Sequence, residues 1–157
     1  MSESLLSTID GSYPGGWPNR QCNLGLSSRG PALLGVLINS KGENDGATQL
    51  RGFGATTVTP VDFGPDAPGW VGSGGDPAVA LYLKCDFEGS TKALHPYTDP
   101  FIEVHVFTSA GLASASPGEV RQALAGIALK LAKAVVRRFP CYNQVQLADR
   151  APVLPPG

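Results

Sequence analysis

The chain has 157 residues, of which 42% are hydrophobic and 16% charged, and its formal net charge at pH 7 is −1. This length and hydrophobicity predict one domain with a substantial core and exclude a typical disordered segment. The near-neutral charge argues against nucleic acid or an anionic membrane as the main partner, because such partners require a clustered positive surface.

The N-terminal part of the chain is dominated by Ser, Gly, Pro and Asn. This composition of residues 1–31 predicts an irregular arm. An apolar run at residues 32–39 is compatible with a buried strand or a short helix, and its β-branched residues and Gly favour the strand. After a polar turn, a further strand is expected over residues 50–63, broken near Pro60.

The middle of the chain predicts a loop followed by two strands. Residues 64–77 carry prolines and a glycine-rich run and are expected to form a loop. Residues 78–87 are apolar and predict a strand. After a turn region at residues 88–100, apolar and polar side chains alternate over residues 101–108, which is typical of a half-buried strand. We expect these two strands to pair antiparallel.

The clearest predicted element is a C-terminal helix. Ser116, Pro117 and Glu119 match a capping box with proline in the first turn. Apolar residues then recur every three or four positions, and basic residues follow near the C-terminal end, where they complement the helix dipole. The apolar stripe comprises Val120, Leu124, Ile127, Leu131 and Val135.

These elements predict an α+β fold in which an antiparallel β-sheet carries one long C-terminal helix on one face, as a two-layer sandwich. The domain is expected over residues 32–147. Residues 145–147 favour a short edge strand, and residues 148–157 form a proline-rich tail.

Three cysteines, Cys22, Cys85 and Cys141, are widely spaced and form no C-x-x-C pair, which excludes zinc ribbons and thioredoxin-type motifs. Either three reduced thiols or one disulfide with a spare thiol fits this count. A strand packed under a helix brings Cys85 and Cys141 close together, so this pair is favoured if a bridge forms.

Metal-ligating residue types gather around one strand. Glu103 and His105 share a strand face by alternation, and His95 lies in the preceding loop, together with Asp99. The competing interpretation makes Glu103 and His105 the solvated face of the strand, and it is favoured because no H-E-x-x-H spacing is present.

No nucleophile motif of the G-x-S-x-G or S-x-x-K type occurs, and the sequence indicates no catalytic residue and no cofactor. Four aromatic residues lie in Gly/Pro-rich segments: Tyr13, Trp17, Trp70 and Tyr97. Such side chains either anchor loops on the core or form a binding surface for a peptide or glycan.

Three segments together resemble uncharacterised ectodomains of actinobacterial secreted or membrane-anchored proteins. They are Leu81-Tyr82-Leu83-Lys84-Cys85, the alanine-rich stretch at residues 123–132, and Cys141-Tyr142-Asn143. The resemblance covers roughly residues 78–145. It implies that the strand cysteine pairs with the cysteine after the helix, and it carries over no catalytic residue.

The first functional hypothesis is a non-catalytic, extracytoplasmic binding or interaction domain for a protein or cell-surface component. The alternatives are a structural subunit of a larger assembly and a small metal-dependent hydrolase. The sequence shows no membrane span and no leader. An extracellular or cell-envelope location is therefore expected if the chain is an excised fragment, and a cytoplasmic one otherwise. The oligomeric state is left open.

Overall fold

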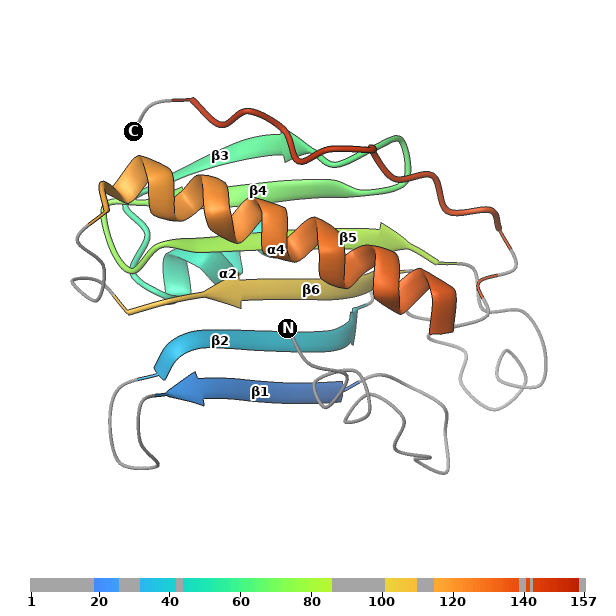
Figure 1. Ribbon diagram of the computed structural model, residues 1–157, viewed down its shortest axis with the longest axis horizontal. Helices are drawn as coiled ribbons and strands as arrows, with labels where there is room; N and C mark the ends of the chain where they lie inside the picture. The colour runs from blue at the N-terminus through green and yellow to red at the C-terminus, as the bar shows by residue number, and fades with distance from the viewer. Residues whose placement is uncertain are drawn as a thin grey trace.

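The described part of the protein forms one sheet with helices on both of its faces (Figure 1). Within that part, no helix has the length and apolar character needed to cross a membrane. The computed structural model describes residues 19–25, 32–41, 44–85, 101–109, 115–138, 141 and 143–155.

The sheet has six strands in the order β1-β2-β6-β5-β4-β3, and every neighbouring pair is antiparallel. The predicted pairing of the strands at residues 78–87 and 101–108 is confirmed. The strands are β1 (Asn19–Gly25), β2 (Ala32–Lys41), β3 (Thr57–Asp62), β4 (Pro68–Ser73), β5 (Ala78–Lys84) and β6 (Phe101–Phe107).

The long helix α4 (Pro117–Arg138) lies across one face of this sheet, over β5 and β6 (Figure 1). Its predicted capping box is present: the Glu119 carboxylate accepts from the Ser116 backbone N–H at 2.9 Å, and the Ser116 hydroxyl accepts from the Glu119 N–H at 3.3 Å. The helix therefore begins where the sequence places it. This confirms the predicted α+β arrangement of a sheet with one long helix.

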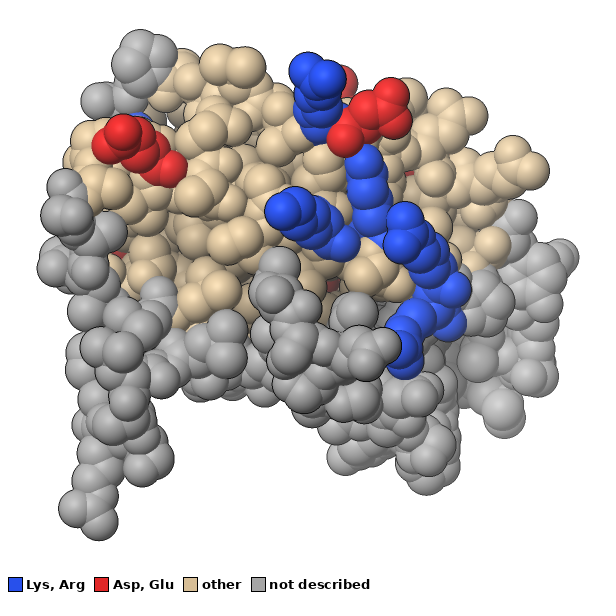
Figure 2. Space-filling model, viewed as in Figure 1, with Lys and Arg blue, Asp and Glu red and all other residues tan. Residues whose placement is uncertain are grey.

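The core between α4 and the sheet is apolar. Buried Val, Ile and Leu side chains from β2, β5 and β6 meet Leu124, Leu131 and Val135 of the helix. Fully buried alanines such as Ala128 let the helix backbone approach the sheet closely. Basic side chains gather over the C-terminal half of the outer helix face, among them the exposed Lys130 and Arg137 (Figure 2).

The second face of the sheet is partly covered by a short helix that the sequence did not predict, α2 (Gly46–Gly52). The strand expected over residues 50–63 is thus wrong in its first part, and only β3 remains of it. At Gly46 the chain passes so close to Trp70 and Tyr82 that a Cβ atom would collide with both rings. The close approach explains why a glycine begins this helix.

Three further expectations need correction. The predicted loop at residues 64–77 contains β4, whose Pro68 stands at the first strand position, where proline is tolerated. The predicted irregular arm at residues 1–31 contains β1, which pairs with β2 along its full length. Residues 145–147 form no strand, although backbone hydrogen bonds connect Gln146 and Ala148 to the turn between β3 and β4.

Candidate functional site

Glu103 and His105 are buried rather than solvated, with relative exposures of 0% each. The expectation of a solvent-facing strand side is therefore wrong. Both residues lie on the sheet face opposite α4, where Phe53, just after α2, stacks edge-on against His105 at a ring separation of 4.7 Å. Alternation correctly placed the two side chains together, but it does not reveal whether a second layer covers them.

Glu103 belongs to a chain of hydrogen bonds that joins the sheet to the start of α2. The Tyr82 hydroxyl lies 3.0 Å from Glu103 Oε1 and 2.8 Å from Asp45 Oδ1. Because Tyr82 and Asn39 are the cross-strand partners of Glu103 on β5 and β2, their side chains stand beside it. Asn39 Nδ2 donates to Glu103 Oε2 at 3.4 Å.

One cation faces both acids of this chain. Lys41 Nζ lies 3.8 Å from Glu103 Oε2 and 3.5 Å from Asp45 Oδ2. Asp45 also accepts a hydrogen bond from Gln49 Nε2 at 3.0 Å. We call the side chains of Asn39, Lys41, Asp45, Gln49, Tyr82 and Glu103 the polar cluster.

Burial and hydrogen bonding shift the pKa values of Glu103 and Asp45 in opposite directions. Burial raises the pKa of Glu103, and Lys41 only partly offsets this effect. Partial burial would also raise the pKa of Asp45, but hydrogen bonds from Gln49 and Tyr82 outweigh it, so that this pKa lies below its usual value. Burial raises the pKa of Tyr82, and the neighbouring carboxyl groups of Glu103 and Asp45 raise it further, which keeps its hydroxyl protonated.

His105 is enclosed by apolar and aromatic groups. Neither ring nitrogen has a hydrogen-bond partner, and the Phe107 ring lies 5.4 Å away. Burial lowers the pKa of His105 to about 4, so the imidazole is neutral at physiological pH. Among the described residues, no three His, Cys, Asp or Glu side chains are arranged to hold a metal ion. His95 lies outside the described residues.

Of the four aromatic residues predicted for binding, only Trp70 is described. Its indole N–H donates to Asn44 Oδ1 at 2.8 Å, and its side chain is half-buried against the segment that leads into α2. Trp70 thus anchors this segment on the sheet. Tyr13, Trp17 and Tyr97 lie outside the described residues.

A disulfide joins Cys85, directly after β5, to Cys141, shortly after α4, with a Cα–Cα distance of 5.1 Å. The favoured pairing is therefore present. The bridge fixes the far end of the helix to the end of the central strand. It also lies next to Lys84, which lines a surface depression formed by described residues.

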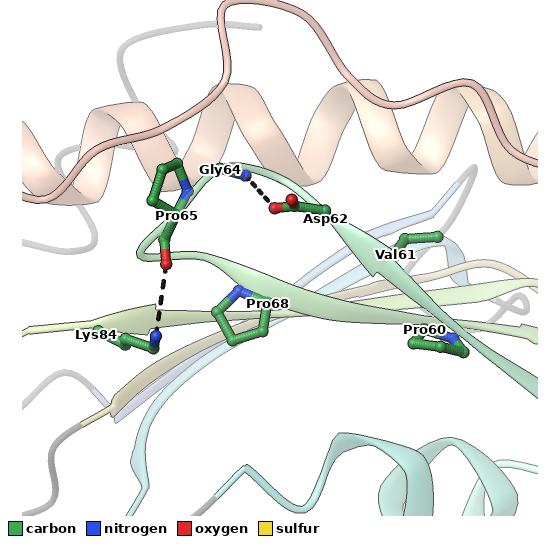
Figure 3. Close-up of a pocket in the computed structure, with 7 residues that line it drawn as sticks. All are labelled: Pro60, Val61, Asp62, Gly64, Pro65, Pro68 and Lys84. Atoms are coloured by element: carbon green, nitrogen blue, oxygen red, sulfur yellow. Dashed lines mark hydrogen bonds between the residues drawn. The ribbon is translucent and has the colours of Figure 1, made fainter.

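This depression, the proline pocket, opens at the turn between β3 and β4 and has a volume of about 390 Å³ (Figure 3). It is shallow and open to solvent, and proline rings form much of its wall. No sequence pattern marks this pocket, because its residues come from three strands and the turn between β3 and β4. They are Pro60, Val61, Asp62, Gly64, Pro65, Pro68 and Lys84.

The wall of the proline pocket is held by the C-terminal segment. Ala148 donates its N–H to the Phe63 carbonyl at 2.7 Å, and the Gln146 N–H donates to Asp66 Oδ2 at 2.9 Å. Gly64 has a φ of 132°, and a Cβ there would lie 2.7 Å from Ala148 N. Only glycine fits this position without strain.

Lys84 supplies the positive charge of the pocket. Its backbone is fixed on both sides, since its N–H donates to the Asp66 carbonyl at 2.8 Å and its carbonyl accepts from Asn143 Nδ2 at 2.8 Å. Its ammonium donates to the Pro65 carbonyl at 3.4 Å (Figure 3). Within the described part of the chain, no carboxylate lies within ion-pair distance of Lys84.

Comparison with known proteins gives no further constraint on this site, because no family model, no curated protein and no solved structure matches the chain.

Proposed function

We propose that this chain is a non-catalytic, extracytoplasmic binding domain that takes an extended segment of a partner protein at the proline pocket and pairs an acidic side chain of that segment with Lys84. The observation that carries this proposal is an exposed lysine on a fixed backbone, Lys84, which has no carboxylate partner among the described residues and lies beside a wall of proline rings. A shallow, open depression suits a peptide segment better than a small molecule, which proteins usually enclose.

Pre-organisation supports a binding role. The pocket wall is held by the disulfide, by the hydrogen bonds of residues 143–148 and by proline rings with fixed φ. A partner that docks here orders few groups on this side of the interface, which reduces the entropic cost of association. The polar lining supplies two charged side chains, Asp62 and Lys84, on separate strands.

The location outside the cytoplasm rests on the Cys85–Cys141 disulfide. Disulfides persist in oxidising compartments and are rare in reducing ones. The resemblance to secreted actinobacterial ectodomains points the same way.

Selection of a phage-displayed random peptide library on the oxidised protein tests this function. Selected peptides are resynthesised, and their affinities are measured for wild type, Lys84→Glu and the matched control Lys130→Glu. Lys130 is exposed on α4 and does not line the proline pocket. Both variants carry the same charge change. We expect acidic peptides whose affinity falls about tenfold or more with Lys84→Glu only. Equal losses in both variants, or no peptide selected above background, would contradict the proposal.

A further inference from the structure

We propose that the polar cluster is a pH-responsive clamp: Glu103 is protonated in the folded protein, donates to the Tyr82 hydroxyl, and through Tyr82 and Asp45 holds the start of α2 on the sheet. Loss of that proton as the pH rises weakens the clamp. The inference is independent of the proline pocket.

Counting protons leads to this assignment. The Tyr82 hydroxyl has one hydrogen, yet its oxygen lies 2.8 Å and 3.0 Å from oxygens of two different carboxyl groups. If both acids were ionised, one of these contacts would set two lone-pair oxygens against each other without a hydrogen. One of the two acids must therefore supply a second hydrogen, and Tyr82 then donates to the other.

Exposure to solvent and the neighbouring polar groups decide whether Glu103 or Asp45 holds the second hydrogen. The Asp45 side chain is 29% exposed and lies nearer the Lys41 ammonium, whereas the Glu103 side chain is 0% exposed. Asp45 also receives the Gln49 amide, which favours its ionised form. A single cation balances a single carboxylate, so the buried Glu103 keeps the proton.

The remaining neighbours of Glu103 do not change this balance. Asn39 on β2 donates to the second carboxyl oxygen, which can accept in either protonation state. His105, two residues along β6, is neutral because burial lowers its pKa to about 4. The titratable and charged groups that face Glu103 within the described residues are therefore Lys41, Asp45, Tyr82 and His105.

The clamp acts on the segment that enters α2. Asp45 directly precedes the helix, and the neighbouring Asn44 accepts the Trp70 indole N–H. An acid whose pKa is raised by folding contributes stability below its ordinary pKa, and this contribution is lost as the pH rises through the raised value. A pH above the raised pKa of Glu103 should therefore loosen residues 44–52 and change the environment of Trp70.

Carbon-13 NMR of side-chain carboxyl groups in glutamate-labelled protein tests the proposal. The chain contains five glutamates, and we expect the Glu103 carboxyl to stay protonated at pH values where the exposed, capping Glu119 is ionised. Its resonance is assigned by its absence in Glu103→Gln or, should that variant not fold, by correlation to the Glu103 backbone in wild type. A Glu103 carboxyl that titrates in the ordinary glutamate range would overturn the clamp.

Unfolding experiments at different pH values test the same proposal through the stability of the protein. Glu103→Gln keeps a donor for Tyr82 that cannot be lost. The decline in stability with rising pH that we expect for wild type should therefore disappear in this variant. Asp45→Asn serves as the matched amide variant: Glu103 still titrates there, but Lys41 is free to balance it, so the decline should remain and begin at lower pH. An unchanged decline in Glu103→Gln would contradict the proposal.

Discussion

The two faces of the sheet are built from the same strands but are held to their neighbouring layers by different forces. On the α4 face, Val104, Leu81 and their neighbours bury apolar surface against the helix. On the α2 face, the alternate residues Glu103 and Tyr82 meet polar partners through directional hydrogen bonds. A single strand such as β6 can therefore contribute a pH-insensitive contact on one side and a titratable one on the other.

This contrast has an energetic basis. Hydrophobic burial scales with area and does not depend on protonation. A buried hydrogen-bond chain adds little net stability when complete, but it costs the desolvation of its groups when one member is lost. We therefore expect a substitution on the α4 face to lower the free energy of unfolding by the same amount at every pH. For a substitution on the α2 face, this amount should depend on pH.

The largest loss of stability should come from removing the Cys85–Cys141 disulfide, which joins the end of β5 to the segment after α4. The cysteines are 56 residues apart, and a chain-entropy argument gives a loss of about 4 kcal/mol for a loop of this length. The double variant Cys85→Ala, Cys141→Ala should show this loss in urea unfolding, with little dependence on pH. A loss confined to alkaline pH would contradict this prediction, because breaking the bridge should lower the free energy of unfolding equally at every pH.

The second-largest loss of stability should come from a cavity in the apolar core. Leu81 is fully buried between β5 and α4, so Leu81→Ala should lower the free energy of unfolding by about 3 kcal/mol. Leu81→Met is the matched control, because it nearly preserves the volume and should cost less than about 1.5 kcal/mol. Equal costs for the two variants would show that this face is loosely packed.

Removing the middle hydroxyl of the clamp should have an intermediate effect. Tyr82→Phe leaves Asp45 and the buried Glu103 without their shared partner, and we expect a loss of about 2 kcal/mol in denaturant unfolding at neutral pH. Phe101, which packs edge-on against the Tyr82 ring, should hold the new phenyl group in place. A neutral substitution would mean that the hydrogen bonds contribute nothing net.

The smallest expected effect is a gain. His105 buries two nitrogens without partners, so His105→Leu should raise the free energy of unfolding by about 1 kcal/mol at neutral pH. Because folding lowers the pKa of His105 to about 4, wild type loses stability as the pH falls below the ordinary histidine value, and the variant should not. Thermal unfolding from neutral to acidic pH checks both points, and a destabilised variant would reveal a hidden partner for the imidazole.

The sequence predicted those features whose signals are local. The capping box at Ser116 placed the start of α4, and alternation along residues 101–108 identified β6. Packing a helix on a strand favoured the pairing of Cys85 with Cys141 but left open whether a bridge forms, and the structure contains it. Each of these depends on residue spacing within one element or on one simple contact between two elements.

The remaining features depend on what a distant segment covers. The helix α2 has only seven residues, too few for a periodic pattern to stand out. Alternation separated Glu103 and His105 from the apolar face but could not show that Asp45 and Phe53 would cover them. The proline and glycines of β4 are typical of a loop, so its sequence did not predict a strand. Pairing with β3 and β5 makes this segment a strand despite that composition.

The most direct test compares the costs of Leu81→Ala and Tyr82→Phe, measured by urea unfolding below and above the pH at which the Glu103 carboxyl titrates in the NMR experiment. We predict the same cost for Leu81→Ala at both, and a smaller cost for Tyr82→Phe at the higher pH, where wild type has lost the Glu103 proton. Costs that are independent of pH for both substitutions would contradict the assignment of titratable stabilisation to the α2 face.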